Sequence, residues 1–274
     1  MSISKERGYY MRLSFVFIFS LWIVPVISAQ DWAKPRLENS PRHLEWIKLK
    51  QDNRTLDGFI AFPESREKAT AVIVIHEIFG LSDWVRGMTD QLAEAGYIAL
   101  APDLLSGMGP NGTGSKELGN DGARSVIRNL SQDQITADLN ACVEYCKTLD
   151  ACNGKVVVCG FCWGGSQTFA FANKNPEVKA FFPFYGSGPT KEEDAANIRS
   201  PIYGFFAAND ARVNASLPKA SEFLKAKGVT FDFVTYETGG HGFMRAGEDP
   251  NGSEGNKIAR AEAWKRWLEL LKKI

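Results

Sequence analysis

The sequence predicts one α/β domain built on a mostly parallel central sheet with helices on both faces. Short apolar segments alternate with longer amphipathic ones, which is the pattern of strands that cross over through helices into a parallel sheet. The central segments AVIVI and KVVVCG are apolar on both faces, as strands between two helix layers must be. Setting aside the first 29 of 274 residues leaves 245, a size that suits one large α/β domain.

The first 29 residues differ from the rest and predict a cleaved export signal. Basic residues precede the apolar run LSFVFIFSLWIVPVI, which ends just before Ser28 and Ala29. Such a run closing on small residues is typical of a signal peptide, whereas a membrane span needs about 20 apolar residues. We expect cleavage after Ala29, a mature domain over residues 30–274, and an exported protein, periplasmic or secreted. Because Ile27 is bulky for its place before the cleavage site, retention as an N-terminal membrane anchor is the alternative, and Met11 is a second possible start.

The charge balance excludes partners that need a strong electrostatic field. Basic and acidic side chains number 32 each, so nothing in the composition gathers nucleic acid or an anionic membrane. The expected partner is a small molecule, and the expected state is a monomer. Five cysteines are an odd number, so in an exported chain at least one thiol stays unpaired or pairs with another molecule.

The expected elements follow one another in order along the chain. The strands are Leu44 to Leu49, Gly58 to Phe62, Ala71 to His76, Tyr97 to Ala101, Lys155 to Gly160, Val178 to Tyr185, Ile202 to Ala207 and Thr230 to Tyr236. The helices are Ser82 to Ala95, Gln132 to Leu149, Trp163 to Asn173, Ser216 to Lys227 and Asn256 to Lys272. The first two strands alternate in polarity and predict an antiparallel hairpin at the sheet edge. Residues 106–129 are rich in Gly and Asn and predict a long loop above the sheet, either a lid or disordered.

The segment VVVCGFCWGG supports two incompatible interpretations. As C-x-x-C, Cys159 and Cys162 would form a dithiol redox pair. As G-x-C-x-G, the segment is a strand-to-helix turn that presents Cys162 as a nucleophile, and the crowding at such a turn requires Gly160 and Gly164. A redox pair makes no demand for those glycines, and Cys159 belongs to the strand, so we favour the turn and expect Cys159 to be a buried structural cysteine.

Two further residues stand where partners of this nucleophile are expected. Asp210 follows the strand PIYGFFA, and His241 follows the strand TFDFVTYE. Reacting groups in an α/β sheet gather at the carboxyl ends of the strands. The chain order nucleophile, acid, histidine is that of a triad built on such a turn. Cys162, Asp210 and His241 are therefore the predicted catalytic residues.

Five segments together resemble the dienelactone hydrolase family, a cysteine-nucleophile branch of the α/β-hydrolase fold, over nearly all of the mature chain. They are VIVIHEIFGL, YIALAPDLL, VVVCGFCWGG, AANDARV and GGHGFMR. The resemblance implies the α/β-hydrolase fold, hydrolysis of a carboxylic ester or lactone, and a Cys162–His241–Asp210 triad that passes through an acyl-thiolester. It also implies that Glu77 holds the resting thiol until substrate binding frees it.

The same resemblance implies roles for other residues near the triad. The backbone N–H groups of Ile78 and Trp163 would form an oxyanion hole. Family members that cleave dienelactone hold the substrate carboxylate with two arginines. Arg245 matches one of them, but Gly107 stands where the other would fall. Cleavage of dienelactone itself is therefore not implied.

Aromatic residues near these segments are candidates for an apolar substrate pocket. Those assigned to substrate binding beside Arg245 are Phe79, Trp84 and Phe243, and further candidates are Phe161, Trp163 and Met244.

No cofactor is expected, because the first strand is not followed by G-x-G-x-x-G, and no metal is expected, because no histidines are paired at metal spacing. Cys142, Cys146 and Cys152 could contribute to a zinc site, but a disulfide or burial on a helix face fits them better. Two other functions stay open: a thiol-disulfide oxidoreductase that uses Cys159 and Cys162, and a non-enzymatic relative of the fold that binds or scaffolds.

Overall fold

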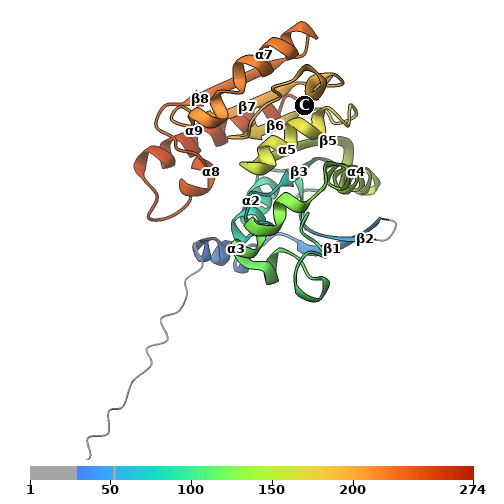
Figure 1. The fold of residues 1–274 in the computed structure, drawn as a ribbon. Coiled ribbons are helices and arrows are strands. Elements are labelled where there is room, and N and C mark those ends of the chain that lie inside the picture. Colours follow the sequence, from blue (N-terminus) through green and yellow to red (C-terminus); the bar gives the residue numbers. More distant parts are fainter. Residues whose placement is uncertain (1–29, 52–53) are drawn as a thin grey trace, which may run out of the picture.

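The computed structural model describes residues 30–51 and 54–274, so the expected export signal lies outside the described residues. One eight-stranded sheet runs through the molecule, with β1 and β2 at one end and β7 and β8 at the other (Figure 1). The strand order is β1-β2-β4-β3-β5-β6-β7-β8. The strands are β1 (Leu44–Gln51), β2 (Arg54–Ala61), β3 (Ala69–Ile75), β4 (Ile98–Pro102), β5 (Cys152–Phe161), β6 (Phe181–Phe184), β7 (Ile202–Ala207) and β8 (Phe231–Tyr236).

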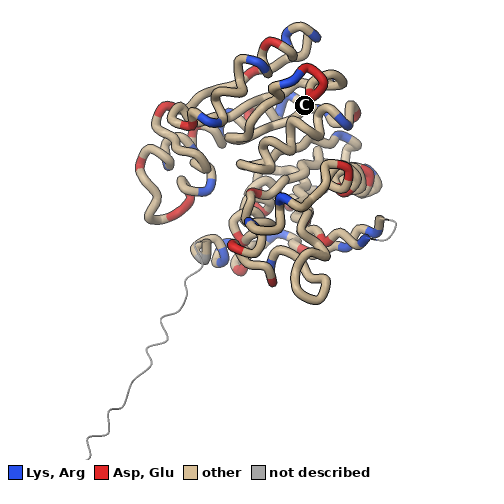
Figure 2. The backbone as a smooth tube through the Cα atoms, viewed as in Figure 1, with Lys and Arg blue, Asp and Glu red and all other residues tan. Residues whose placement is uncertain are grey.

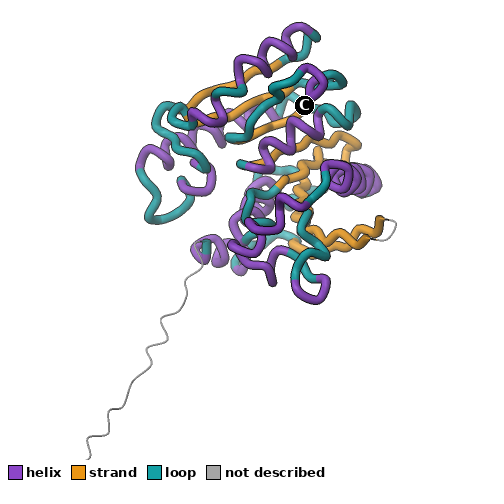
Figure 3. The backbone as a smooth tube through the Cα atoms, viewed as in Figure 1, coloured by secondary structure: helices purple, strands orange, loops and turns teal. Residues whose placement is uncertain are grey.

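The strands β3 to β8 run parallel to one another, whereas β2 pairs antiparallel with both β1 and β4. The predicted hairpin at the sheet edge and the mostly parallel sheet are thus confirmed. Every described helix connects or flanks these strands (Figure 3). The helices are α1 (Lys34–Glu38), α2 (Asp83–Glu94), α3 (Ser115–Val126), α4 (Gln132–Thr148), α5 (Trp163–Ala172), α6 (Ala211–Asn214), α7 (Leu217–Ala226), α8 (Phe243–Ala246) and α9 (Glu254–Leu271).

Two apolar clusters cover the two faces of the sheet. On β3, Ile73 and Ile75 pack with α4, α5 and α7, whereas Val72 and Val74 pack with α2, α8 and α9. All four side chains are fully buried. Burial on both faces explains why the central strands are apolar throughout instead of alternating.

Basic and acidic residues are interspersed along the backbone (Figure 2). No helix among residues 30–51 and 54–274 is both long and apolar enough to cross a membrane.

The expectation of a loop over residues 106–129 is wrong for half of that segment. Helix α3 occupies Ser115–Val126 and is kinked at Gly119, whose φ of 62° is left-handed. Ala123 and Ile127 bury their side chains against Leu105. The Gly and Asn content of this segment disfavours a helix, so tertiary packing stabilises the helix that forms here.

Register brings the carboxyl ends of the central strands to one edge. Ile75 at the end of β3 aligns with Gly160 near the end of β5, and Ala207 at the end of β7 aligns with Tyr236 at the end of β8. The loops that follow β3, β5, β7 and β8 consequently meet above this edge. These loops carry the predicted catalytic residues.

Candidate active site

Cys162 lies on a tight turn between β5 and α5. Its φ of 57° is in the left-handed region, which costs energy for any residue with a Cβ. A Cβ at Gly160 would lie 2.2 Å from the Gly164 carbonyl oxygen, and one at Gly164 would lie 2.4 Å from the His76 carbonyl oxygen. Both neighbours are backbone atoms, so the turn can form only with glycine at these two positions.

The three predicted catalytic side chains form one hydrogen-bonded chain. The Cys162 Sγ lies 3.1 Å from His241 Nε2, and His241 Nδ1 lies 2.5 Å from Asp210 Oδ2. An ionised carboxylate only accepts hydrogen bonds, so Nδ1 carries the proton and Nε2 presents a lone pair to the thiol. The Asp210 side chain is 7% exposed and that of His241 is 36% exposed, so the acid is shielded while the imidazole is accessible.

Local structure holds the acid in place. Asp210 follows β7 and caps the short helix α6, where its Oδ1 accepts a hydrogen bond from the Val213 N–H at 3.4 Å. Its Oδ2 is thereby left for His241. The imidazole packs edge-on against the Tyr185 ring, with centroids 5.3 Å apart. Tyr185 also has a positive φ of 39° at the end of β6.

The Cys162 thiol is a weak acid where it stands. Burial and the neighbouring Glu77 carboxylate raise its pKa to about 11, while the backbone N–H groups of Trp163 and Ile78 act on the sulfur in the opposite direction. The thiol is therefore protonated near neutral pH and needs a base to become nucleophilic. These are the two N–H groups that the family resemblance assigns to an oxyanion hole, and both lower the pKa of this thiol.

Glu77 is held by Arg245 and not by the thiol. Arg245 Nε donates to Glu77 Oε2 at 2.8 Å, and the Glu77 side chain is 3% exposed. Burial raises the pKa of Glu77, and the Arg245 charge opposes that rise. The structure thus shows the Cys162 sulfur directed toward His241, with Glu77 paired to Arg245 beside it.

Arg245 also lies over the Phe79 ring, with its guanidinium carbon 5.3 Å from the ring centroid. Arg124 of α3 lies 5.9 Å from the same centroid. Phe79 lines a hollow of about 560 Å³ together with Trp46 of β1 and residues of α2 and α3. This hollow extends from the loop after β3 and contains both polar and apolar side chains.

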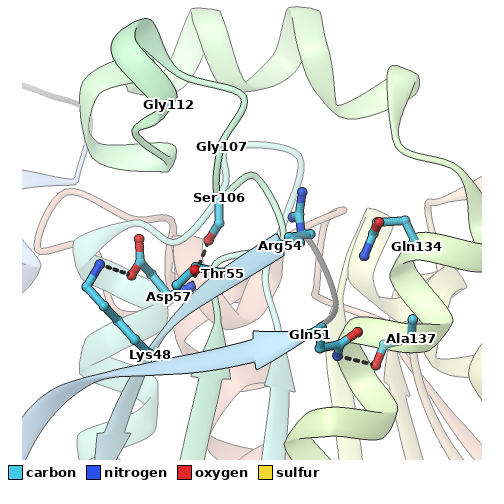
Figure 4. Close-up of a pocket in the computed structure, with 10 residues that line it drawn as sticks. All are labelled: Lys48, Gln51, Arg54, Thr55, Asp57, Ser106, Gly107, Gly112, Gln134 and Ala137. Atoms are coloured by element: carbon cyan, nitrogen blue, oxygen red, sulfur yellow. Dashed lines mark hydrogen bonds and ion pairs between the residues drawn. The ribbon is translucent and has the colours of Figure 1, made fainter.

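A second hollow, of about 660 Å³, lies at the β2 side of the same sheet edge (Figure 4). Lys48 and Arg54 reach it from the β1–β2 hairpin, and Gln134 reaches it from α4. Gly107, which stands in place of the second family arginine, lines this hollow with a φ of 82° and leaves open space. Lys48 is paired with Asp57 at 2.7 Å, so its charge is already neutralised.

The positions of the five cysteines do not match those expected for a dithiol redox site. All five are free thiols, and Cys159 is fully buried in the cluster that includes Val157 and Phe161. Cys142, Cys146 and Cys152 are buried in the opposite cluster. A fully buried Cys159 gives no access to a dithiol substrate, so the geometry favours the nucleophile interpretation of Cys162.

Two residues assigned to substrate binding lie elsewhere. Trp84 packs edge-on against Phe161 at 5.0 Å, and Phe243 packs against Tyr185 at 5.2 Å. Both side chains are fully buried, with 0% relative exposure, and reach neither solvent nor the hollows. Their assignment is corrected: they support the site from within the core. Met244 and Phe161 are likewise buried.

Two side chains at the site are not predicted by the sequence motifs. Tyr185 ends a predicted strand, and that position was a usable signal. His76 also ends a predicted strand, next to Glu77, but its contacts are visible only in the structure.

Comparisons with known proteins point to one family. A family model described as the dienelactone hydrolase family matches residues 56–274. A protein of Methylorubrum extorquens, provisionally named a carboxymethylenebutenolidase, is 30% identical over 210 residues, covering 72% of this chain and 71% of that protein. One from Synechocystis with the same provisional name is 29% identical and covers 82% of this chain and 94% of that protein.

Solved structures show the same fold. A protein of Klebsiella pneumoniae, provisionally named a dienelactone hydrolase, superposes with a TM-score of 0.74 at 22% identity, covering 85% of this chain and 99% of that one. The dienelactone hydrolase of Anabaena variabilis superposes with a TM-score of 0.60 at 16% identity, covering 81% of this chain and 96% of that one.

Proposed function

This chain belongs to the dienelactone hydrolase family, and we propose that it hydrolyses a carboxylic ester or lactone with Cys162 as the nucleophile. The observation that carries the proposal is the chain of contacts at the turn, 3.1 Å from Cys162 Sγ to His241 Nε2 and 2.5 Å from His241 Nδ1 to Asp210 Oδ2. A base within hydrogen-bond reach of a nucleophile, itself oriented by a third group, is the arrangement that nucleophilic catalysis needs.

In the first half-reaction, Cys162 Sγ bonds to the acyl carbon while its proton passes to His241 Nε2. The carbonyl oxygen becomes an oxyanion, stabilised by the N–H groups of Ile78 and Trp163. Collapse of the tetrahedral intermediate breaks the bond to the leaving oxygen, which takes the proton from His241. The product is an acyl-thiolester on Cys162 and a free alcohol, or the ring-opened hydroxyl end of a lactone.

In the second half-reaction, water attacks the thiolester and gives a proton to His241. The sulfur leaves, the acid is released, and the thiol recovers its proton. Asp210 keeps the imidazole in the tautomer with Nδ1 protonated and stabilises the imidazolium that forms twice per cycle.

Arg245 supports a substrate that carries a carboxylate. Its side chain is 27% exposed beside the thiol, and the guanidinium can pair with an anion in fork geometry. With Gly107 in the place of a second arginine, we propose weaker discrimination between charged and uncharged substrates than a two-arginine enzyme has.

Hydrolysis of p-nitrophenyl acetate and of a panel of lactones tests the proposal. The purified protein should release nitrophenol, Cys162→Ala should abolish the release, and Cys159→Ala should keep it. Equal loss in a folded Cys159→Ala variant would support the dithiol alternative. Absence of hydrolysis across the panel by the unmodified protein would support a non-enzymatic relative.

A further inference from the structure

His76 is fully buried between the loop that carries Ile78 and the start of α5. Its Nδ1 lies 2.8 Å from the Glu77 carbonyl oxygen. Its ring stacks on the Trp163 indole, with centroids 5.5 Å apart and planes 17° apart. One side chain thus contacts the Glu77–Ile78 peptide and the indole of Trp163, and the N–H groups of Ile78 and Trp163 both lower the pKa of the Cys162 thiol.

The hydrogen bond to Glu77 fixes the tautomer of this histidine. A carbonyl oxygen only accepts, so His76 Nδ1 carries the proton and donates. Burial lowers the pKa of His76, which keeps the imidazole neutral. Its Nε2 has no hydrogen-bond partner within residues 30–51 and 54–274. A buried acceptor without a partner destabilises the fold, so stability alone does not explain a histidine here.

The contact with Glu77 controls the direction of the Ile78 N–H. The Glu77 carbonyl and the Ile78 N–H belong to one peptide unit, and no peptide bond in the described chain is cis. In a trans peptide the C=O and N–H point in opposite directions within one plane. A donor that holds the oxygen therefore aims the N–H the other way, toward the Cys162 sulfur on which it bears.

A second contact holds the same oxygen less closely. The Gly80 N–H donates to the Glu77 carbonyl at 3.2 Å, against 2.8 Å for His76. The turn at Gly80 packs closely against Ser115. A Cβ added at Gly80 would lie only 2.2 Å from the Ser115 hydroxyl oxygen. Loss of the His76 donor would loosen the Ile78 N–H without removing it.

We propose that His76 is a positioning residue of the oxyanion hole, whose Nδ1–H holds the Glu77–Ile78 peptide with the Ile78 N–H aimed at the acyl oxygen. This rests on the proposed esterase function. His76 itself touches no reacting atom, and its effect passes through the peptide that it holds.

Two variants separate the hydrogen bond from the ring. His76→Phe keeps a ring to stack on Trp163 but has no donor, whereas His76→Asn loses the ring and places an amide N–H where Nδ1 stood. Removing an oxyanion donor outright costs about 10²–10³ in kcat. Because the Ile78 N–H stays nearby, we expect His76→Phe to lower kcat on p-nitrophenyl acetate about tenfold with KM nearly unchanged, and His76→Asn to stay within about threefold of the unmodified protein. Should His76→Phe not fold, His76→Leu, which has the outline of Asn without the donor, replaces it.

Two reagents distinguish positioning from general damage. Iodoacetamide alkylates Cys162 at a tetrahedral carbon and forms no oxyanion at its carbonyl. Because the Ile78 N–H is the smallest of the named causes of the Cys162 pKa shift, the alkylation rate should fall far less in His76→Phe than kcat does. A trifluoromethyl ketone, 1,1,1-trifluoro-4-phenylbutan-2-one, adds the thiolate to its carbonyl and forms an oxyanion. Its affinity, measured by ¹⁹F NMR, should fall by the same factor as kcat.

The outcomes separate the two proposals. Unchanged kcat and ketone affinity in His76→Phe, or an equal loss of alkylation, overturn the role of His76. An unmodified protein that hydrolyses no ester but loses ketone affinity in His76→Phe overturns the esterase function and keeps the positioning role. If the unmodified protein neither hydrolyses esters nor binds the ketone, both proposals fall.

Discussion

Replacing Glu77 by glutamine should make the Cys162 thiol more acidic. Glu77 is among the causes that raise the Cys162 pKa to about 11, second to burial. The Glu77→Gln change removes this like charge and leaves the Arg245 cation unneutralised beside the sulfur, and both effects favour the thiolate. The glutamine amide oxygen can still accept the hydrogen bond from Arg245 Nε, so the local geometry is kept.

The size of the effect follows from the thiol pKa. With a pKa of about 11, roughly one thiol in a thousand is ionised at pH 8. A fall of about one unit, the scale on which a neighbouring charge acts, raises that fraction about tenfold. Thiolate nucleophilicity drops as the pKa drops, with a Brønsted slope of about 0.4–0.5, so alkylation at pH 8 should rise only about threefold.

The assay is the rate of iodoacetamide labelling from pH 6.5 to pH 10.5, with the labelled peptide identified by mass spectrometry. The other thiols are at most 5% exposed and should not compete. In the unmodified protein the rate should climb without levelling across this range, because the pKa lies above it. In Glu77→Gln the curve should shift to lower pH.

Glu248→Gln is a matched control. Glu248 is another buried carboxylate paired with an arginine, Arg260, at 3.0 Å, but it is not among the causes of the Cys162 shift. Its replacement should leave the labelling curve in place. A curve that stays fixed or moves to higher pH in Glu77→Gln would refute the electrostatic argument, and a plateau near pH 7 in the unmodified protein would show that the thiol is not the weak acid described.

Three other predictions concern substrate charge, the turn and the N-terminus. Arg245→Lys should lower kcat/KM for carboxylate-bearing lactones about tenfold more than for uncharged esters, because lysine has no guanidinium fork; equal losses for both classes would make the residue structural. Gly160→Ala should lower the melting temperature and abolish activity, since its Cβ would lie 2.2 Å from the Gly164 carbonyl oxygen, whereas Gly87→Ala, with its nearest neighbour 4.0 Å away, should be neutral or stabilising by up to about 1 kcal/mol. Mass spectrometry of exported protein should find Gln30 as the first residue, and an intact apolar run would support the anchored form.

The sequence predicts the triad because each member follows a strand with a clear pattern. Cys162 comes directly after an apolar strand and has glycines two positions before and after it, and Asp210 and His241 follow strands of the same parallel sheet. In a parallel sheet the carboxyl ends of strands share one edge, so residues distant in the chain are brought together by topology alone.

Helix α3 and the interior aromatic residues could not be predicted in this way. The helix contains Gly119 and Gly122, and its start is held by Ser115, whose N–H and hydroxyl both bind the Asp103 carboxylate, at 2.8 and 2.5 Å. These contacts span 12 residues and leave no local pattern. Trp84 is an aromatic residue of the kind that often lines pockets, and only its packing shows that it faces the core.

The Glu77–Arg245 pair, which joins residues 168 apart, changes what the family resemblance implies for the resting thiol. Only Nε of Arg245 bonds to Glu77 among the described residues, at 2.8 Å. The two terminal nitrogens remain as donors on a side chain that is 27% exposed. A substrate carboxylate can therefore bind Arg245 without first displacing Glu77. Because the Cys162 sulfur already faces His241, substrate binding then need only place a carboxylate on the terminal nitrogens of Arg245 and orient the acyl group. In that case Glu77→Gln should lower the KM of an anionic lactone only modestly, through the loss of one neighbouring negative charge. A mechanism that begins by separating the pair requires a much larger fall in KM, since the competing carboxylate is gone.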